Sequence, residues 1–237
     1  MVRKAPESLG IIPDGNRRFA KRLMKAPWKG HEWGTRKVED VFYWAKDAGV
    51  KSITFYTLSL ENLDTRPRRE LDFLMRIARK EMQDIVNGKS FVHREKVKVN
   101  IIGNLEKLPE ELQALSREVM EKTKDYRNFT INLAVAYGGR QELVNAARSI
   151  ALDISGGKLS PEQVNEMVFR QHLQTNGQKD PDLIIRTGYE KRLSNFLLFQ
   201  SAYSEFAFVD CFWPEFSKKH FDAVIRDYQN RERRFGK

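Results

Sequence analysis

Cysteine is almost missing from this chain of 237 residues, since Cys211 is the only one. The chain therefore forms no internal disulfide and no cysteine-based zinc site. Its four histidines, at positions 31, 93, 172 and 220, show no metal-ligand spacing. This composition excludes a disulfide scaffold and is typical of a protein of the reducing cytosol.

Long apolar runs are missing too. No stretch approaches the roughly 20 apolar residues that cross a bilayer, and the N-terminal MVRKAPESLG lacks the apolar core of a secretory signal. No internal repeat and no Pro-, Gly- or Ser-rich linker divides the chain. We therefore expect one domain over residues 1–237, cytoplasmic and at most peripheral at a membrane surface.

The common signatures of nucleotide and acyl chemistry are also absent. The chain has no GxxxxGK[ST] loop, no GxGxxG after an apolar run and no GxSxG elbow. Phosphoryl transfer from a nucleotide, dinucleotide binding and serine hydrolysis therefore have little support.

What the chain has in excess is positive charge. Lys and Arg number 42 against 32 Asp and Glu, a net charge of +10. Such a balance suits nucleic acid, an anionic membrane surface or polyanionic small substrates. The charge is spread along the chain, without an RNP, KH or zinc-finger signature, so we expect no nucleic-acid partner.

Apolar, β-rich runs alternate with segments of helical pattern. The runs cover 9–12, 52–58, 97–102, 129–136, 182–186 and 206–209, and the helical segments about 30–48, 67–94, 108–125, 140–154, 160–173 and 217–234. This alternation predicts an α/β fold with a mostly parallel six-stranded sheet surrounded by helices. Ligands of such sheets bind at the carboxyl ends of the strands.

The first candidate site follows the run 9–12, where Asp14, Gly15, Asn16, Arg17 and Arg18 form a strand-to-helix junction. Backbone N–H groups and arginines at a helix start favour an anion. A carboxylate there would repel a phosphate unless a divalent cation lay between the two. The junction therefore indicates a metal together with a diphosphate.

A second cluster contains Arg186, Lys191, Arg192 and Ser194, with Ser194 predicted to cap a helix over SNFLLFQSAY. It is interpreted as a diphosphate pocket, or else as a solvated basic loop. Glu205, just before the last strand, is a metal or substrate contact or a surface ion pair.

The long segment 67–94 repeats apolar residues at helical spacing. Core packing explains most of that face. The alternative is that part of it lines an apolar tunnel.

Motifs along nearly the whole chain resemble those of the cis-prenyltransferases, the undecaprenyl/dehydrodolichyl diphosphate synthase family. They are IIPDGNRRFAKR at 11–22, GHEWG at 30–34, LSLEN at 58–62, NLAVAYGGRQELV at 132–144, the run 182–208, FWPEF at 212–216 and the terminal RFG. The resemblance implies a central parallel sheet with an apolar tunnel, a homodimer, and Mg²⁺-dependent condensation of isopentenyl diphosphate with an allylic prenyl diphosphate. The product would be delivered to a membrane.

The resemblance also assigns residues. Asp14, Asn16 and Asn62 match catalytic positions, and Asp14 and Glu205 match residues that bind Mg²⁺. The allylic diphosphate would contact Gly15, Asn16, Arg17, Arg18, His31, Ser59 and Arg66. The isopentenyl diphosphate would contact Arg186, Arg192, Ser194, Arg234 and Gly236, the last two reaching toward the partner subunit. Arg17 in place of the glycine common in bacteria hints at an archaeal-type member or a eukaryotic-like branch of the family.

Departures from the family pattern cluster on the allylic side. Pro27 stands where bacterial members carry an arginine, Leu63 replaces an aromatic residue, and the loop 64–67 is one residue longer. We therefore predict an altered allylic preference or a non-head-to-tail condensation. A non-catalytic subunit of a heteromeric enzyme is a further alternative, opposed by the retention of Asp14, Asn16, Arg18 and Glu205.

Overall fold

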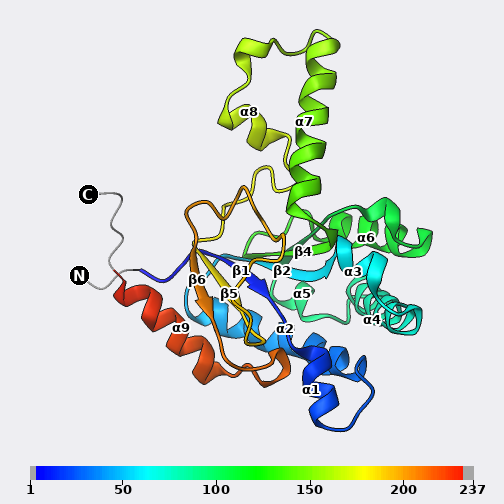
Figure 1. Ribbon diagram of the computed structural model, residues 1–237, viewed down its shortest axis with the longest axis vertical. Coiled ribbons are helices and arrows are strands. Elements are labelled where there is room, and N and C mark those ends of the chain that lie inside the picture. Colours follow the sequence, from blue (N-terminus) through cyan, green and yellow to red (C-terminus); the bar gives the residue numbers. More distant parts are fainter. Residues whose placement is uncertain (1–3, 232–237) are drawn as a thin grey trace.

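A six-stranded, all-parallel sheet forms the centre of the protein. The computed structural model describes residues 4–231, and its strands follow the order β3-β4-β2-β1-β5-β6 (Figure 1). The strands are β1 (Ser8–Ile12), β2 (Ser52–Ser59), β3 (Val97–Ile102), β4 (Phe129–Tyr137), β5 (Leu183–Arg186) and β6 (Glu205–Phe208). All six predicted strands and the α/β class are confirmed.

Strand β1 lies in the middle of the sheet, and every one of its residues is buried. Leu9 pairs with Ile53 of β2 on one side and Leu183 of β5 on the other. Burial on both faces explains why the strand is a continuous apolar run rather than an alternating one. The carboxyl ends of β2, β1 and β5 consequently lie side by side.

The helices and short 3-10 turns connect these strands. They are α1 (Asn16–Arg22), α2 (Lys29–Asp47), α3 (Leu60–Thr65), α4 (Arg68–Val86), α5 (Phe91–Arg94), α6 (Glu110–Thr123), α7 (Gly139–Ser155), α8 (Glu166–Gln171) and α9 (Lys218–Asn230), with 3-10 turns at Leu105–Lys107, Pro161–Gln163 and Trp213–Glu215. Helices α2, α4, α6 and α9 share one large core with one face of the sheet. Among its buried residues are Phe42, Met82, Leu112 and Phe221.

The other face of the sheet is covered largely by an irregular segment rather than by helices. Phe196 and Leu197 pack there on Tyr56 and Ile184. The predicted helix over SNFLLFQSAY is wrong, because Ser194, Asn195 and Leu197 all have positive φ angles (50°, 66° and 44°). Repeated left-handed residues are incompatible with a right-handed helix.

Two further helical predictions need correction. The segment predicted as one helix over 67–94 is two helices, α4 and α5, separated by a turn in which Gly88 has φ +75°. Ser90 then caps α5 by accepting the N–H of Val92 at 3.3 Å. In the segment 160–173 the Ser160 capping box opens only a 3-10 turn, and α8 begins separately at Glu166.

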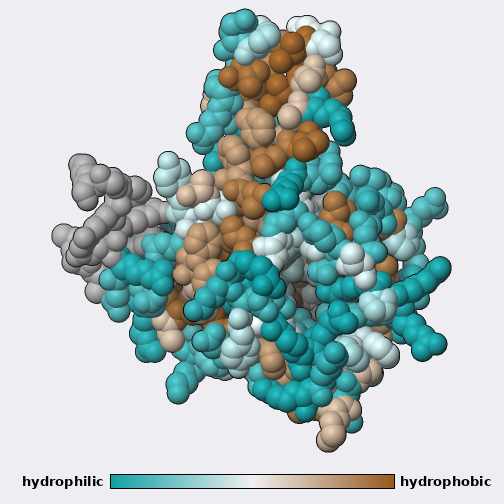
Figure 2. Space-filling view, viewed as in Figure 1, coloured by the Kyte–Doolittle hydropathy of each residue, from teal (hydrophilic) through white to brown (hydrophobic). Residues whose placement is uncertain are grey.

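Helices α7 and α8 form an arm that projects away from the sheet (Figure 1). Apolar residues gather over this arm in the space-filling view (Figure 2). Leu152 and Met167 are 66% and 65% exposed, and Val144 is 52% exposed. The arm therefore presents several large apolar side chains to solvent.

Candidate active site

Asp14 occupies the short turn between β1 and α1. Gly15, with φ +102°, caps α1, and a Cβ at this position would lie 2.6 Å from the ring of Phe212. Only glycine suits that conformation and that space. The turn lets the Gly15 N–H donate to Asp14 Oδ1 at 2.6 Å, which fixes the carboxylate at the carboxyl edge of the sheet.

Arg186, the last residue of β5, joins Asp14 to the second predicted cluster. Its Nη2 donates to Asp14 Oδ2 at 2.8 Å, and its Nη1 donates to Ser194 Oγ at 2.8 Å and to the Arg192 carbonyl. Arg186 is only 3% exposed. The left-handed turn at Ser194 thus presents its hydroxyl to Arg186 instead of capping a helix.

Arg18 completes this group, which we call the Asp14 cluster. Its Nη2 lies 3.4 Å from Asp14 Oδ1, and its Nη1 lies 3.2 Å from Glu190 Oε1. Arg192 Nη1 donates to the other oxygen of Glu190 at 2.5 Å. Three guanidiniums, those of Arg18, Arg186 and Arg192, are therefore gathered around two carboxylates.

A second group, the Glu70 cluster, lies where α1, α2 and α4 meet. Glu70 is 2% exposed and is surrounded by two guanidiniums and an imidazole. Its Oε2 lies 3.4 Å from Arg17 Nε, while its Oε1 lies 3.1 Å from Arg66 Nη1 and 3.2 Å from His31 Nε2. The structure thus brings together Arg17, His31 and Arg66, three of the residues predicted for the allylic diphosphate.

Burial and charge oppose one another in the Glu70 cluster. Burial raises the pKa of Glu70, but the His31 hydrogen bond and the charges of Arg66 and Arg17 outweigh it and hold that pKa below its ordinary value. Burial lowers the pKa of His31, and Arg66 lowers it further despite the hydrogen bond to Glu70. The carboxylate is therefore ionised and the imidazole neutral at pH 7.

A cavity of about 530 Å³ begins beside both clusters, with Asn16 and His31 in its lining. The amide of Asn16 donates to the Pro13 carbonyl at 3.0 Å. Its Oδ1 is buried and has no hydrogen-bond partner among the described residues. Farther in, the lining is mainly apolar and includes Phe55, Leu74, Ala78, Met82, Leu112 and Ile131.

Ser59 and Asn62 lie at the end of β2, at the same edge of the sheet. Ser59 Oγ accepts the Asn62 N–H at 3.1 Å and so caps α3, a short helix that the sequence pattern did not predict. The two residues thus share one rigid turn next to the cavity residue Leu58.

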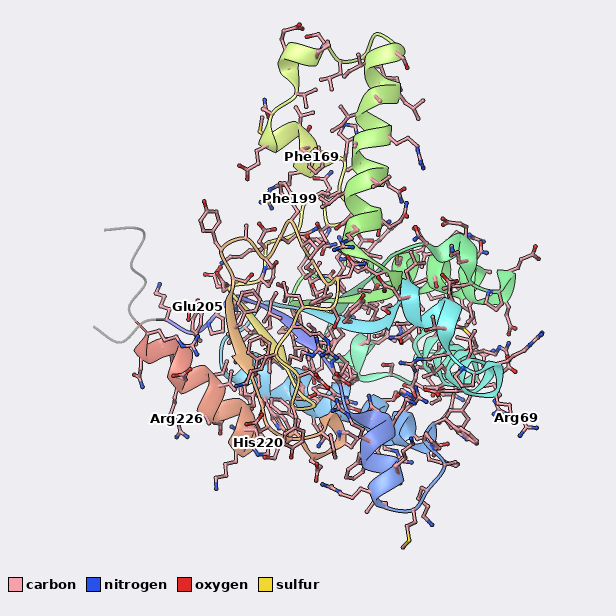
Figure 3. All side chains as sticks on the ribbon, in the orientation of Figure 1. Arg69, Phe169, Phe199, Glu205, His220 and Arg226 are labelled. Atoms are coloured by element: carbon pink, nitrogen blue, oxygen red, sulfur yellow. The ribbon has the colours of Figure 1, made fainter. Side chains whose placement is uncertain are left out.

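Glu205 lies elsewhere. It is the first residue of β6 and pairs with Leu183, so it lies at the amino end of the strands, opposite the edge that carries Asp14 (Figure 3). Its Oε2 accepts from Arg231 Nη1 at 3.3 Å. Within one chain the structure does not bring Glu205 to Asp14, and its metal role stays a prediction. Arg234 and Gly236 lie outside the described residues.

The donor set around Asp14 suits a particular kind of metal site. Among residues 4–231 no group of three His, Cys, Asp or Glu side chains could hold an ion by itself. Asp14 offers one carboxylate, 31% exposed, at an edge rich in guanidiniums. Mg²⁺ commonly binds through one or two carboxylates together with substrate phosphates and water. The residues present fit that arrangement.

The fold and the two clusters define a class of protein before any comparison. An all-parallel sheet with two arginine-rich clusters beside an apolar cavity suits an enzyme that handles diphosphates attached to hydrophobic chains. The comparisons agree. The family model described as putative undecaprenyl diphosphate synthase matches residues 12–236.

Relatives narrow the class further. A tritrans,polycis-undecaprenyl-diphosphate synthase (geranylgeranyl-diphosphate specific) of Methanopyrus kandleri is 47% identical over 234 residues, covering 99% of this chain and 86% of the relative. The protein of the same name from Pyrococcus horikoshii is 44% identical, covering 98% and 87%. The chain belongs to the undecaprenyl diphosphate synthase family and is a prenyltransferase, as the motifs predicted.

Solved structures support the same assignment. Lavandulyl diphosphate synthase from Lavandula x intermedia, in complex with dimethylallyl diphosphate, superposes with a TM-score of 0.92 at 35% identity, covering 98% of this chain and 99% of that one. A probable undecaprenyl diphosphate synthase from Campylobacter jejuni gives 0.79 at 29% identity, covering 98% and 99%.

Sequence reasoning missed the two acidic anchors, Glu70 and Glu190. Glu70 follows Arg66 by four residues, but Arg66 lies in extended backbone just before α4, so the pair is not formed along one helix face. Glu190 lies in the family-like run 182–208, but no role was predicted for it from the sequence. Its signal was the position between two arginines, Arg186 and Arg192.

Proposed function

We propose that this prenyltransferase condenses isopentenyl diphosphate with an allylic diphosphate of about twenty carbons, in cis and in successive rounds. The observation that carries the proposal is the cavity of about 530 Å³ that starts at Asn16 and His31 and continues into an apolar interior. A growing prenyl chain would be held there by burial, at about 0.8 kcal/mol per CH₂. The geranylgeranyl specificity in the names of the archaeal relatives supports a long primer.

We assign the isopentenyl diphosphate to Arg186, Arg192 and Ser194 of the Asp14 cluster. Arg186 is fixed by Ser194 and by the Arg192 carbonyl before substrate arrives, so its guanidinium needs little reorganisation. Arg192 is 60% exposed and can exchange Glu190 for a diphosphate oxygen. Together they provide one fixed cation and one mobile cation for the same diphosphate.

We assign the allylic diphosphate to the N-terminus of α1 and the Glu70 cluster. Arg17 and Arg66 supply two guanidiniums there, while Pro27 supplies none. Lys29 does not replace the missing arginine, because its Nζ lies against Phe73 and within 3.3 Å of Glu32. The neutral His31 and the Asn16 amide add polar contacts at the start of the cavity.

Asp14 would hold Mg²⁺ together with diphosphate oxygens. When bound, the ion neutralises charge on the departing diphosphate as a Lewis acid. The chain's own residues bind the two substrates so that the isopentenyl double bond faces C1 of the allylic substrate. The bond from C1 to the diphosphate oxygen breaks, a carbon–carbon bond forms, and a proton is then lost from the isopentenyl unit.

A second candidate is non-head-to-tail condensation of short substrates. It is favoured by the 0.92 TM-score to lavandulyl diphosphate synthase and by the loss of an arginine at Pro27. The long apolar lining of the cavity favours the chain-forming reaction instead.

Product analysis decides between the two. Labelled isopentenyl diphosphate and Mg²⁺ are supplied with allylic primers of 5, 10, 15 and 20 carbons, and products are sized by mass spectrometry. We expect long cis-polyprenyl diphosphates, with the 20-carbon primer used best, and no product after chelation of Mg²⁺. A branched ten-carbon product from five-carbon substrates would support the alternative.

A substitution inside the cavity tests whether the cavity holds the growing prenyl chain. Ala78→Phe should fill the interior and shorten the product by one or more five-carbon units, since the added ring occupies space meant for the chain. Ala223→Phe, on the exposed face of α9, is the matched control and should leave product length unchanged.

We also propose a homodimer formed through the arm. The exposed Leu152, Met167 and Val144 provide the apolar area that such an interface needs. In a dimer, Arg234 and Gly236 would reach the partner's isopentenyl site. Light scattering of the purified protein should give twice the mass of 27.7 kDa, and Leu152→Asp should return it to one chain.

Within residues 4–231, no helix has both the length and the apolar character required to cross a membrane.

A further inference from the structure

The segment that joins α1 to α2 carries an exposed apolar tip among cations. Met24 is 94% exposed and Leu23 is 44% exposed. Lys21 and Lys25, both exposed, flank them, and neither forms an ion pair with any described carboxylate. We call residues 21–29 the tip loop. An apolar tip ringed by lysines is typical of segments that bind membrane surfaces.

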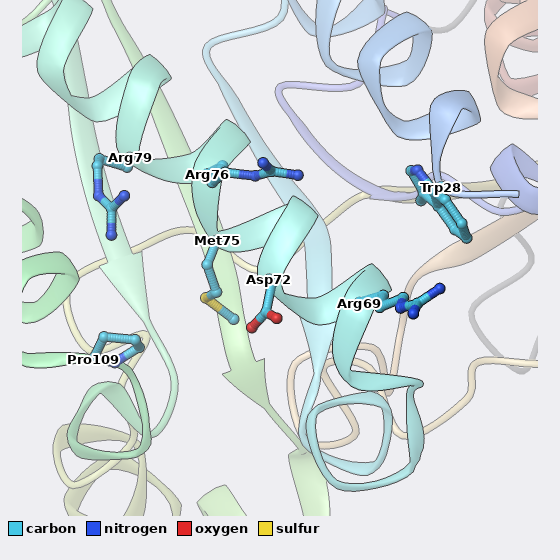
Figure 4. Close-up of a pocket in the computed structure, with 7 residues that line it drawn as sticks. All are labelled: Trp28, Arg69, Asp72, Met75, Arg76, Arg79 and Pro109. Carbon is cyan, nitrogen blue, oxygen red and sulfur yellow. The ribbon is translucent and has the colours of Figure 1, made fainter. Parts of the chain in front are cut away.

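A basic groove lies next to the tip loop, on the outer side of α4. It has a volume of about 540 Å³ and is lined by Trp28, Arg69, Asp72, Met75, Arg76, Arg79 and Pro109 (Figure 4). Arg79 is neutralised by Glu111 at 2.8 Å. Arg69 and Arg76 form no ion pair among the described residues, and Asp72 is the one carboxylate in the lining. The groove therefore keeps an unbalanced positive charge.

The tip loop and the groove form one continuous surface. Trp28 belongs to both. Lys29 Nζ and Arg76 Cζ lie over the same ring, that of Phe73, at 5.7 and 5.4 Å from its centroid. Contact with an aromatic ring leaves the guanidinium of Arg76 free for an outside anion, whereas Lys29 is already paired with Glu32 at 3.3 Å.

This surface also lies against the cavity assigned to the prenyl chain. Met75 lines both the groove and the cavity. One side chain of α4 therefore separates the outer surface from the interior that would hold a hydrophobic product.

We propose that the tip loop and the groove dock the protein on an anionic phospholipid bilayer. Met24 and Leu23 insert among the acyl chains, and Trp28 lies at headgroup level, where indole rings concentrate. Arg69, Arg76, Lys21 and Lys25 face the lipid phosphates. The cavity is then held beside the membrane that receives its product. Lipid is favoured over nucleic acid because a phosphate backbone offers no apolar environment in which Met24 and Leu23 could be buried.

Vesicle sedimentation tests the proposal without substrates, so its outcome does not depend on the proposed reaction. The wild-type protein is mixed with vesicles of phosphatidylcholine alone, or with 30% phosphatidylglycerol. We expect binding to the anionic vesicles only, with a steep decrease at 0.5 M NaCl. A single-stranded RNA that competes with the vesicles, and whose own binding depends on Met24, would overturn the assignment to lipid.

Matched variants locate the surface. Met24→Ser should weaken vesicle binding about tenfold, because the burial of an apolar side chain is lost, while Met24→Leu should retain it. Arg69→Gln with Arg76→Gln should weaken binding about 25-fold, roughly fivefold for each charge near an anionic surface. The control pair Lys219→Gln with Arg226→Gln, both exposed and seven residues apart on α9, removes equal charge; Arg226 is labelled in Figure 3. Equal loss in both pairs, or full binding by Met24→Ser, would overturn the proposal.

Discussion

Two carboxylates at one edge of the sheet each gather arginines, yet they differ in exposure. Asp14 is 31% exposed and shares its oxygens with Arg186 and Arg18. Glu70 is 2% exposed and holds Arg17, Arg66 and His31. An open carboxylate can accept a metal ion and change partners, whereas a buried one acts as a fixed anchor. From this difference in exposure we propose that Asp14 contributes to the chemistry and that Glu70 holds the cations in position.

Replacement of the open carboxylate should have the largest effect. Asp14→Asn keeps the shape but removes the charge that would bind Mg²⁺, and we expect kcat/KM to fall about 1000-fold, as when a key electrostatic group is lost. Steady-state kinetics with both substrates measure it. Asp180→Asn is the control, because Asp180 is 33% exposed and pairs with Arg170 at 2.7 Å away from the site. Near wild-type activity of Asp14→Asn would show that Asp14, like Glu70, does not take part in the chemistry.

Replacement of the buried carboxylate should act differently. Glu70→Gln leaves Arg66 and Arg17 without their counter-charge, so we expect the KM for the allylic substrate to rise more than kcat falls. Broken buried ion pairs typically cost about 3–5 kcal/mol, so the free energy of unfolding should also decrease in a urea titration. Glu111→Gln, which breaks the exposed pair with Arg79, should change neither quantity measurably. A drop in kcat with an unchanged KM would make Glu70 a participant in the chemistry instead.

The two arginines of the Glu70 cluster differ in exposure and are expected to contribute differently to allylic binding. Arg17 is 47% exposed and Arg66 14% exposed, so Arg17 is freer to leave Glu70 for a ligand. Arg17→Gln should raise the allylic KM about tenfold, the value of one charge-assisted hydrogen bond, and leave the isopentenyl KM within twofold. Arg22→Gln, which breaks an exposed pair with Glu215, serves as the control. Equal rises in both KM values would show that the two clusters are not separate sites.

The Asp14 cluster was open to prediction from sequence, and the Glu70 cluster only in part. Asp14 and Arg186 end neighbouring strands, so the alternation of strands and helices was enough to predict one shared edge. Glu70 depends on how α1, α2 and α4 pack, which no local pattern encodes. The helix predicted at Ser194 failed for a related reason. A hydrogen bond from Arg186, eight residues earlier at the end of β5, holds that hydroxyl in a left-handed turn.

The smallest expected effect is a pH dependence of stability that comes from His31, the neutral partner of Glu70. Because burial holds the pKa of His31 below its usual value, the unfolded chain binds a proton there before the folded chain does as pH falls. Stability tied to His31 is therefore present above about pH 6.5, the unfolded pKa, and is lost as pH falls toward the folded pKa. The melting temperature of the wild type should decrease more between pH 7.5 and 5 than that of His31→Gln. Each kcal/mol corresponds to about 2–4 °C at this chain length.

The same titration tests whether the Glu70 cluster binds an anion. A diphosphate placed next to Arg17 and Arg66 adds negative charge beside His31 and should raise the pKa of its imidazole. With inorganic diphosphate present, the extra loss of stability at low pH in the wild type should shrink, and His172→Gln should behave as the wild type does. If diphosphate leaves the difference between the wild type and His31→Gln unchanged, the anion does not bind at the buried carboxylate. The allylic site would then have to be sought along α1 alone.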